Sequence, residues 1–285
     1  MDDTLRILIP KGRIFDKVAQ LFSDAGYPLS LTDRAYRPLL GAAGLTGKIM
    51  KPQNVGELLE LGSHDAGFTG LDWITESRAQ VVQIMDLGFD TVRIVAAVPA
   101  GMDDAELRSK RLTVATEYVH LAEDWLQKSG FSYRILRTYG ATEVFPPDDA
   151  DMIIDNTASG RTLKENGLRI TGTLLESSTR FAASPAALSN PAKKRRIEEL
   201  GMLFKAVLDA RERVMLEMNV SKALFPDLVR CLPSMRSPTV APLHGGDGYA
   251  LKIAVPKSEV PEMIPRLKTL GATDIVEYGL RKVVL

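Results

Sequence analysis

The chain has 285 residues, 45% of them hydrophobic and 25% charged, which is typical of a globular protein with a sizeable core. Its 36 Lys and Arg balance 36 Asp and Glu, so charge favours neither nucleic acid nor a membrane surface as a partner. The single cysteine, Cys231, excludes an intramolecular disulfide, and three scattered histidines do not favour a His/Cys metal site. Neither a signal peptide nor an apolar run of roughly 18 residues is evident, so we expect a cytoplasmic protein.

Short apolar runs that alternate with helix-like segments predict an α/β fold. The expected strands are Leu5–Ile9, Asp65–Thr69, Val92–Val98, Leu112–Ala115, Tyr133–Thr138, Met152–Asp155 and Gly172–Ser178. The expected helices are Ile14–Ala25, Leu71–Arg78 and Leu121–Ser129. Beyond them, apolar residues at helical spacing predict a longer helix that starts at Pro191, with Ser189 or Asn190 as its N-cap. Its "KKRR" segment is more typical of a solvated helix face than of a nucleic-acid patch, because no aromatic residue accompanies it.

The segment 212–285 is expected to form a separate small domain. Its predicted elements are a strand Val214–Val220, a helix Ser221–Leu232, strands Thr239–Leu243 and Tyr249–Val255, a helix Ser258–Leu270, and strands Ile275–Tyr278 and Lys282–Leu285. The order strand–helix–strand–strand–helix–strand is the ferredoxin-like arrangement. Such modules often regulate or mediate interactions, although the fold alone does not establish a role.

The stretch "DNTASGRTL", residues Asp155–Leu163, follows an apolar strand and consists mainly of small polar residues. An acid at the carboxyl end of such a strand faces the crevice where α/β proteins bind ligands. The residues after it can present backbone N–H groups, hydroxyls and Arg161 to an anion, with Gly160 permitting close approach. Two interpretations stay open: a cradle for a sugar phosphate such as ribose 5-phosphate, or a plain strand-to-helix turn.

Three further stretches also follow predicted strands. "PKGRIFD" places Lys11 and Arg13 on either side of Gly12, which suits a polyanion, although basic residues on such loops are common. In "GFTGLDWITE", Gly70 permits close approach and Asp72 is either a helix cap or a ligand contact, and Lys51 can face the same cleft. Glu117 and Glu143 follow other strands, where each carboxylate can accept from an amine or support a magnesium ion.

These residues carry a resemblance to a known family. The stretches "KGR", "GFTGLDWITE", "VATEY", "GATEVFPP", "ADMIIDNTASGRTLKENGL" and "LPSMRSPTVAPL", in this order, resemble the long form of ATP phosphoribosyltransferase, the first enzyme of histidine biosynthesis. The resemblance implies a bilobed catalytic part at residues 1–211 that is similar to type II periplasmic binding proteins, with lobe two at roughly 93–180. It also implies that residues 212–285 are a ferredoxin-like (ACT-like) regulatory domain.

The family's reaction joins ATP to phosphoribosyl pyrophosphate and releases pyrophosphate, with Mg as cofactor. The resemblance implies a phosphoribosyl pyrophosphate loop made of Asp155, Thr157, Ala158, Ser159, Gly160, Arg161, Thr162 and Leu163. ATP would contact Lys11, Gly12, Arg13, Lys51, Gly70 and Asp72, and the residues implied in catalysis are Lys11, Arg13, Glu143 and Asp155. Glu143 would lie near the ribose or the metal, and the ligands of the metal are not specified beyond a role for the substrate phosphates.

Histidine is implied as an allosteric inhibitor, bound near Asn219, Met235, Thr239 and Ala272, and the assembly as a hexamer. Three positions depart from the family pattern. Asn156 stands where members commonly have an apolar residue, Asp149 stands near a common glycine, and Asn219 stands where some members have an acid. An alternative hypothesis is a non-catalytic cytosolic small-molecule sensor built on the same bilobed clamp.

Overall fold

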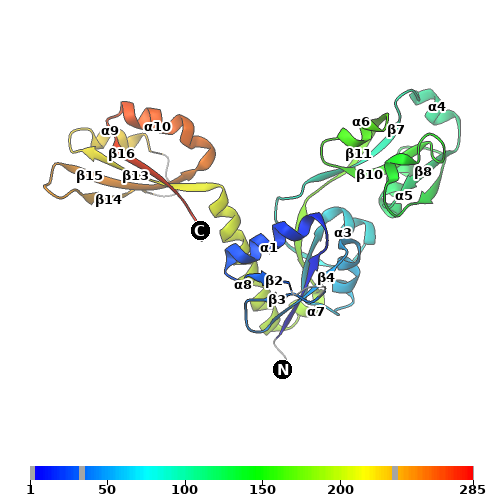
Figure 1. The fold of residues 1–285 in the computed structure, drawn as a ribbon, viewed down its shortest axis with the longest axis horizontal. Helices are drawn as coiled ribbons and strands as arrows, with labels where there is room; N and C mark the ends of the chain where they lie inside the picture. Colours follow the sequence, from blue (N-terminus) through cyan, green and yellow to red (C-terminus); the bar gives the residue numbers. More distant parts are fainter. Residues whose placement is uncertain (1–3, 32–35, 233–236, 285) are drawn as a thin grey trace. The chain divides into compact units, whose positions relative to one another are not determined.

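The computed structural model describes residues 4–31, 36–232 and 237–284. The chain divides into two compact units, the first formed by residues 1–23 and 27–201, the second by residues 24–26 and 202–285. The division falls within the long helix α8 (Pro191–Arg211). Each unit has its own sheets and core, and the elements are labelled in Figure 1.

The first unit begins with a lobe built on a five-stranded sheet, which we call lobe one. Its strand order is β4 (Leu45–Met50), β1 (Leu5–Pro10), β5 (Ala66–Gly70), β12 (Thr179–Ala183) and β6 (Val82–Asp86). The helices of this lobe are α1 (Arg13–Ala25), α2 (Val55–Glu60), α3 (Leu71–Ser77) and α7 (Pro185–Leu188). A small pair, β2 (Leu29–Ser30) and β3 (Leu39–Leu40), completes the lobe.

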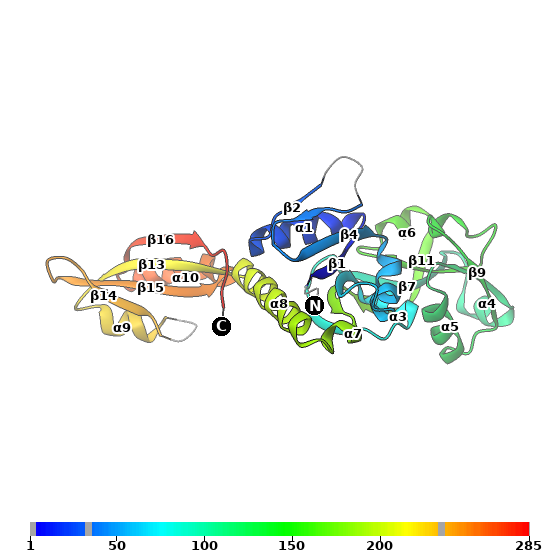
Figure 2. The same ribbon diagram turned by 90° about the horizontal axis from the view of Figure 1, so that it is seen from below.

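The sheet of lobe one is mixed. Strand β1 runs parallel to β4 and β5, whereas β12 runs antiparallel to β5 and β6. Helix α1 lies along the sheet (Figure 2), where Phe22 contacts Phe68 of β5 with the ring centroids 5.6 Å apart. Because β1 is buried from Ile7 onward, that part of it is a continuous apolar run in the sequence, and only Arg6 near its start is exposed.

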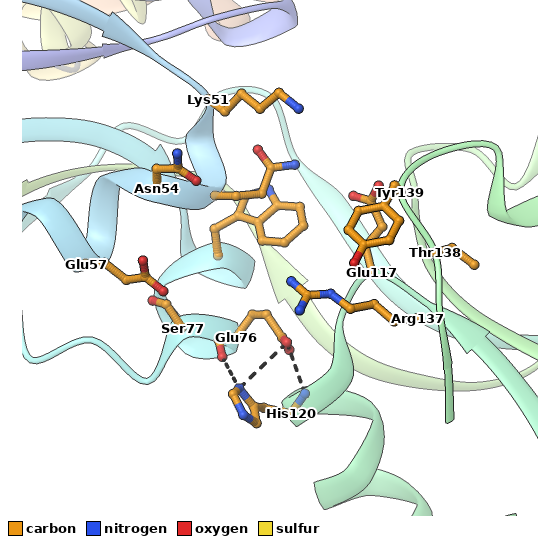
Figure 3. Close-up of a pocket in the computed structure, with 12 residues that line it drawn as sticks. Lys51, Asn54, Glu57, Glu76, Ser77, Glu117, His120, Arg137, Thr138 and Tyr139 are labelled. Carbon is orange, nitrogen blue, oxygen red and sulfur yellow. Dashed lines mark hydrogen bonds and ion pairs between the residues drawn. The ribbon is translucent and has the colours of Figure 1, made fainter. Parts of the chain in front are cut away.

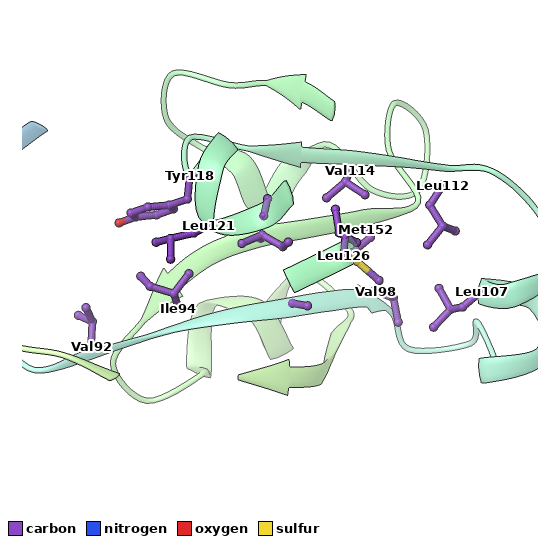
Figure 4. Packing of buried hydrophobic residues seen from close by; sticks show 13 residues of the cluster. Val92, Ile94, Val98, Leu107, Leu112, Val114, Tyr118, Leu121, Leu126 and Met152 are labelled. Atoms are coloured by element: carbon purple, nitrogen blue, oxygen red, sulfur yellow. The ribbon is translucent and has the colours of Figure 1, made fainter. Parts of the chain in front are cut away.

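The second lobe of this unit, lobe two, has its own five-stranded sheet. Its order is β11 (Leu168–Ser177), β7 (Val92–Pro99), β10 (Met152–Thr157), β8 (Leu112–Thr116) and β9 (Tyr133–Arg137). The helices of lobe two are α4 (Asp104–Ser109), α5 (Val119–Lys128) and α6 (Arg161–Glu165). Figure 4 shows the core between the sheet and α5, where Ile94, Val114 and Met152 of the strands pack with Leu126 of the helix.

The chain passes between the lobes twice, through residues 87–91 and through Ser178. The two crossings lie side by side, since the Leu87 N–H donates to the Thr179 carbonyl at 2.9 Å and the Thr179 N–H donates to the Phe89 carbonyl at 3.0 Å. The Ser178 hydroxyl also donates to Asp86 Oδ1 at 2.6 Å. The expected bilobed, type II periplasmic-binding-protein-like α/β fold is thus confirmed by the sheet topology.

The second unit contains a four-stranded antiparallel sheet. Its elements in chain order are β13 (Arg213–Ser221), α9 (Phe225–Arg230), β14 (Thr239–Pro242), β15 (Gly248–Pro256), α10 (Val260–Thr269) and β16 (Thr273–Gly279). The strand order β14–β15–β13–β16 is that of a ferredoxin-like fold, as expected. Both helices lie on one face of the sheet (Figure 1) and share a core with the alternate residues of β13.

One expected strand of this unit is not formed in the described residues. The expected strand at Lys282–Leu285 is wrong for residues 282–284, which are irregular, and residue 285 lies outside the described part. The Val283 N–H donates to the Ala206 carbonyl of α8 at 2.9 Å, so this segment bonds to a helix rather than to the sheet.

In the described ranges, no helix has the length and apolar content needed to cross a bilayer.

Candidate functional site

The three parallel strands of lobe one end at the same edge of their sheet. Lys11 follows β1, Lys51 follows β4, and Asp72 lies in the first turn of α3, directly after β5. The Lys11 N–H donates to the Met50 carbonyl at 2.7 Å, which holds the ends of β1 and β4 together. The structure therefore brings the expected cations and acid of this lobe to the edge where α/β sheets bind ligands.

Lobe two has a matching edge. Strands β8, β9 and β10 run parallel to one another and end at Glu117, Arg137 and the Asp155–Thr157 segment. Glu143 lies in a short 3₁₀ turn, Thr142–Val144, where its charge acts on Asp155. Glu117, Glu143 and Asp155, which follow separate strands in the sequence, thus lie at the same edge of the sheet of lobe two.

Residues of both edges line two cavities. The larger, of about 470 Å³, is lined by Lys51, Gln53 and Trp73 from lobe one and by Glu117, Arg137 and Tyr139 from lobe two. Figure 3 shows these side chains around the cavity, with His120 bonded to Glu76 at its rim. The smaller cavity, of about 270 Å³, is lined by Lys11, Arg13, Gly70 and Asp72 from lobe one and by Tyr118 and Asn156 from lobe two.

The phosphate-loop candidate begins in β10 and ends in α6. The Gly160 N–H donates to Thr157 Oγ1 at 2.9 Å, and the Arg161 N–H donates to Ser159 Oγ at 3.3 Å. Gly160 has φ = 80°, the left-handed conformation that glycine adopts without strain. Thr157 and Leu163 are buried and anchor the loop, whereas Ala158, Ser159, Arg161 and Thr162 are exposed. The loop is anchored at both ends and presents its middle to solvent.

Asp155 is the most perturbed carboxyl group of this edge. Burial, with added repulsion from the charges of Glu143 and Glu117, raises the pKa of Asp155 to about 6. The Asn156 N–H, which donates to Asp155 Oδ1 at 2.7 Å, acts in the opposite direction. Titratable groups with shifted pKa values in a cleft are typical of functional sites.

The cations beside β1 are exposed, and each already has a neighbour. Arg13 Nε lies 2.9 Å from Asp90 Oδ1, and Lys11 Nζ lies 5.6 Å from the centroid of the Tyr36 ring. Lys17 also approaches Asp90, at 4.0 Å. Gly12 has φ = 86°, so the loop between the two cations requires a residue that tolerates the left-handed region.

Asp72, in contrast, is only 5% exposed, and both of its carboxylate oxygens accept hydrogen bonds from the protein. Ser177 Oγ donates to Oδ1 at 2.6 Å, and the Tyr118 hydroxyl donates to Oδ2 at 2.9 Å. A Cβ at Gly70 would lie 2.0 Å from Asp72 Oδ1, so only glycine fits there. The alternative that Asp72 caps its helix is not seen, because its side chain bonds elsewhere.

Several residues of the site were not singled out from the sequence. Asp90 pairs with Arg13 from the crossing segment, and Glu76 bonds the first N–H groups of α5 at His120 and Leu121, both at 3.0 Å. Glu76 and Trp73 lie within the quoted "GFTGLDWITE" stretch, so their position after β5 was a usable signal. Arg137 and Tyr139 carry no local motif and become recognisable only when the lobes are assembled.

The expected effector-site residues lie in the second unit. Asn219 of β13 donates to Asp274 Oδ2 at 3.0 Å, and Ala272 is buried just before β16. Thr239 is exposed at the start of β14, the opposite edge strand of the sheet. Met235 lies outside the described residues.

Within the described ranges, no group of three or more His, Cys, Asp or Glu side chains forms a metal cluster. The charges of Glu143 and Glu117 act on Asp155, but these carboxylates form no metal cluster of their own. Magnesium commonly keeps several waters and is held through substrate phosphates, so an ion brought by a phosphorylated substrate would not need such a cluster.

A bilobed α/β unit with opposed strand-end loops, followed by a ferredoxin-like module, defines a class of ligand-clamping proteins with an accessory domain. Residues 51–206 match the family model for ATP phosphoribosyltransferase, and residues 210–282 match that for the HisG C-terminal domain. The chain therefore belongs to the ATP phosphoribosyltransferase family and is an enzyme of the glycosyltransferase type.

Individual relatives support this membership over the whole chain. An ATP phosphoribosyltransferase from Thermodesulfovibrio yellowstonii is 36% identical and covers 99% of both chains. One from Chlorobium phaeobacteroides is 35% identical and covers 100% of this chain and 99% of its own. The solved ATP phosphoribosyl transferase (HisG:HisZ) complex from Thermotoga maritima is 25% identical, with a TM-score of 0.63 over 71% of this chain and 99% of its own. The sensor alternative is not favoured by these matches.

Proposed function

We propose that the enzyme binds ATP and phosphoribosyl pyrophosphate between its two lobes, joins adenine N1 to the anomeric carbon, and releases pyrophosphate. The observation that carries the proposal is the pairing of an exposed, anchored loop after β10 with cations after β1 and β4 at facing strand ends. We assign catalysis to residues 1–211 and regulation to residues 212–285, and we place the enzyme in the cytoplasm.

The loop Asp155–Leu163 is assigned to phosphoribosyl pyrophosphate. The exposed hydroxyls of Ser159 and Thr162, the Arg161 side chain and the first N–H groups of α6, which have no acceptor within the helix, suit a phosphate monoester. As a carboxylate, Asp155 accepts hydrogen bonds from two adjacent ribose hydroxyls. Arg161 already pairs with Glu165 at 2.7 Å, and this exposed pair gives way to phosphate at little cost.

ATP is assigned to the larger cavity and the adjoining lobe-one edge. Lys51 contributes positive charge there, Trp73 contributes an aromatic surface, and Gln53 Oε1 is buried without a hydrogen-bond partner among the described residues. The exocyclic amine of adenine is a donor that would satisfy this oxygen. Lys11, Gly12, Arg13 and Gly70 border the smaller cavity and its loop, which suits the phosphates.

The chemistry requires no protein nucleophile. Adenine N1 forms the bond to the anomeric carbon, and the bond to the pyrophosphate oxygen breaks with its electron pair leaving on pyrophosphate. Lys11 and Arg13 neutralise the charge that develops on the leaving group, and magnesium bound to the substrate phosphates supplies further positive charge. Glu143 lies near Asp155 and orients the ribose or the metal hydration shell.

The two substrate assignments are tested by equilibrium binding of each substrate to matched variants. Thr162→Ala is expected to weaken phosphoribosyl pyrophosphate about tenfold through lost phosphate contacts and to leave ATP affinity within about twofold. Lys51→Ala is expected to weaken ATP binding about tenfold and to leave the affinity for phosphoribosyl pyrophosphate within about twofold. Calorimetry with Thr75→Ala as a control, whose hydroxyl bonds only the Leu71 carbonyl, measures both constants. Equal losses of both substrates in both variants would contradict the assignment.

We propose histidine as a feedback inhibitor that binds the ferredoxin-like module in a hexamer. Thr239 and Ala272 lie at the two opposite edges of the four-stranded sheet. These edges are three strand spacings apart, a distance of about 14 Å, which is more than one histidine spans. A histidine site that includes both Thr239 and Ala272 therefore needs residues from two copies of the chain. Sedimentation that gives a monomer at all concentrations would contradict the hexamer.

Replacing Thr239 by alanine is expected to raise the histidine concentration for half-inhibition about tenfold, within the range of ordinary allosteric coupling. The uninhibited kcat should stay within about twofold of wild type, because Thr239 belongs to the second unit. Inhibition curves with Thr269→Ala, an exposed hydroxyl on α10, provide the control. If histidine does not inhibit the unmodified enzyme, the feedback proposal is refuted and the catalytic proposal is unaffected.

A further inference from the structure

A chain of hydrogen bonds connects the phosphate loop in lobe two with α3 in lobe one. The Asn156 amide nitrogen lies 3.2 Å from Asp155 Oδ1 and 3.2 Å from the Tyr118 hydroxyl. The Tyr118 hydroxyl lies 2.9 Å from Asp72 Oδ2, and Ser177 Oγ lies 2.6 Å from Asp72 Oδ1. This series of hydrogen bonds thus extends from Asp155 to Ser177 at the end of β11, next to the crossing at Ser178.

The direction of each bond follows from the chemistry of the groups. A carboxylate only accepts, so the Tyr118 hydroxyl donates its one proton to Asp72. The Tyr118 oxygen then accepts from Asn156 Nδ2, and the second amide proton goes to Asp155. Burial, followed by the charge of Asp72, raises the pKa of Tyr118 far above its usual range, which keeps this proton in place.

The surroundings hold Tyr118 in one position. Its side chain is 1% exposed, and its ring stacks on Trp73 with the centroids 4.4 Å apart. Trp73 follows Asp72 in α3, so one helix of lobe one fixes both the ring and the hydroxyl of Tyr118. Since both oxygens of Asp72 are occupied, Asp72 is suited to orient Tyr118 rather than to bind a substrate hydroxyl directly.

We propose that Asp72, Tyr118 and Asn156 act as a positioning array that orients Asp155 and links the phosphoribosyl loop to the nucleotide side of the cleft. The inference rests on the proposed function for the role of Asp155. It gives Asn156, one of the residues that depart from the family pattern, a task that an apolar side chain at this position does not perform.

The array is tested with Asn156→Leu, Tyr118→Phe and the double variant. Asn156→Leu removes both donors, and Tyr118→Phe removes only the hydroxyl and keeps the stacked ring. Each single variant is expected to raise the KM for phosphoribosyl pyrophosphate about tenfold. The double variant should match Asn156→Leu within about twofold, because the two residues act through one contact. Tyr133→Phe, which removes a hydroxyl bonded to Gln127 in the same lobe, is the control and should match wild type.

A pH profile separates positioning from a purely structural role. Asp155, with Glu143 and Glu117 facing it, should control the acid limb of kcat/KM for phosphoribosyl pyrophosphate. Asn156→Leu removes the side-chain donor to Asp155 Oδ1 but keeps the backbone N–H that lowers the pKa of Asp155, so this limb should move to slightly higher pH. The isosteric Asn156→Asp should move it further, because it adds a like charge beside Asp155.

Two results would overturn the array. One is a set of losses that simply add in the double variant, and the other is an Asn156→Leu profile with the wild-type acid limb. If the unmodified protein binds phosphoribosyl pyrophosphate without turnover, the proposed function fails, but the dissociation constants of the same variants still decide about the array. Unchanged binding by Asn156→Leu and Tyr118→Phe would then reject it.

Discussion

Replacing Asp155 by asparagine is expected to lower kcat/KM for phosphoribosyl pyrophosphate by about 100-fold, the typical size for a charged group that orients a reacting substrate. In the unmodified enzyme the carboxylate is lost as the pH falls through about 6, because burial, with added repulsion from Glu143 and Glu117, raises the pKa of Asp155 to that value. The wild-type rate should therefore fall below this pH, and the variant should lack the limb. Initial rates from pH 5 to 8 measure both effects.

The same substitution should stabilise the fold. An acid with a raised pKa in the folded state binds its proton more tightly there, so stability falls as the pH rises from the unfolded pKa to about 6 and stays lower above it. Asparagine removes this penalty, which amounts to at most about 3 kcal/mol for a pKa raised from 3.8 to about 6. Asp148→Asn, an exposed loop variant, is the control. An Asp155→Asn enzyme with wild-type rate and an intact acid limb would contradict the role of this carboxylate.

Replacing Asp65 by alanine is expected to destabilise the first unit by about 3 kcal/mol, the low end of the cost of breaking a buried ion pair. The Asp65 side chain is 3% exposed and accepts from the Arg6 N–H at 2.8 Å and from Lys193 Nζ at 2.8 Å. It joins the start of β5 to β1 and to α8. The free energy of unfolding from denaturant titration at pH 7 measures the effect.

The deficit should depend on pH. Burial alone would raise the pKa of Asp65, but hydrogen bonds from Arg6 and Lys193 outweigh it and lower the pKa. The stabilisation is then fully present above the unfolded pKa and is lost as the pH falls through the folded pKa, so the two proteins should converge in acid. Glu199→Ala, which breaks an exposed pair with Arg195, should cost less than about 1 kcal/mol. Equal costs for the two variants at pH 7 would be inconsistent with the buried pair.

Strands with continuous apolar runs could be predicted from the sequence, because full burial leaves a local signal. Strand β4 contains Gly47 and Lys48 and has no such run, and β12 is separated from β11 by Ser178 alone, so both were missed. The predicted helix Ser221–Leu232 is shorter in the structure, where α9 starts at Phe225 with Pro226 in its first turn. The local sequence pattern identified most of the strands and helices, whereas strand pairing and tertiary contacts determine where each element begins and ends.

The candidate site shows the same division. The phosphate-loop stretch and "KGR" could be located because each follows a predicted strand. The contacts of Tyr118 with Asp72 and Asn156 could not be predicted, because they span 46 and 38 positions of sequence, and the contact with Asp72 also requires both lobes in place. The same is true of Asp90, which meets Arg13 only through the crossing segment.

The most direct test of the central claim is pyrophosphate release by the purified full chain with magnesium, ATP and phosphoribosyl pyrophosphate, with the product mass determined in parallel. We expect release only when both substrates are present, together with one product whose mass is the sum of the substrates less pyrophosphate. Release from phosphoribosyl pyrophosphate alone, or substrate binding with no joined product, would contradict the account.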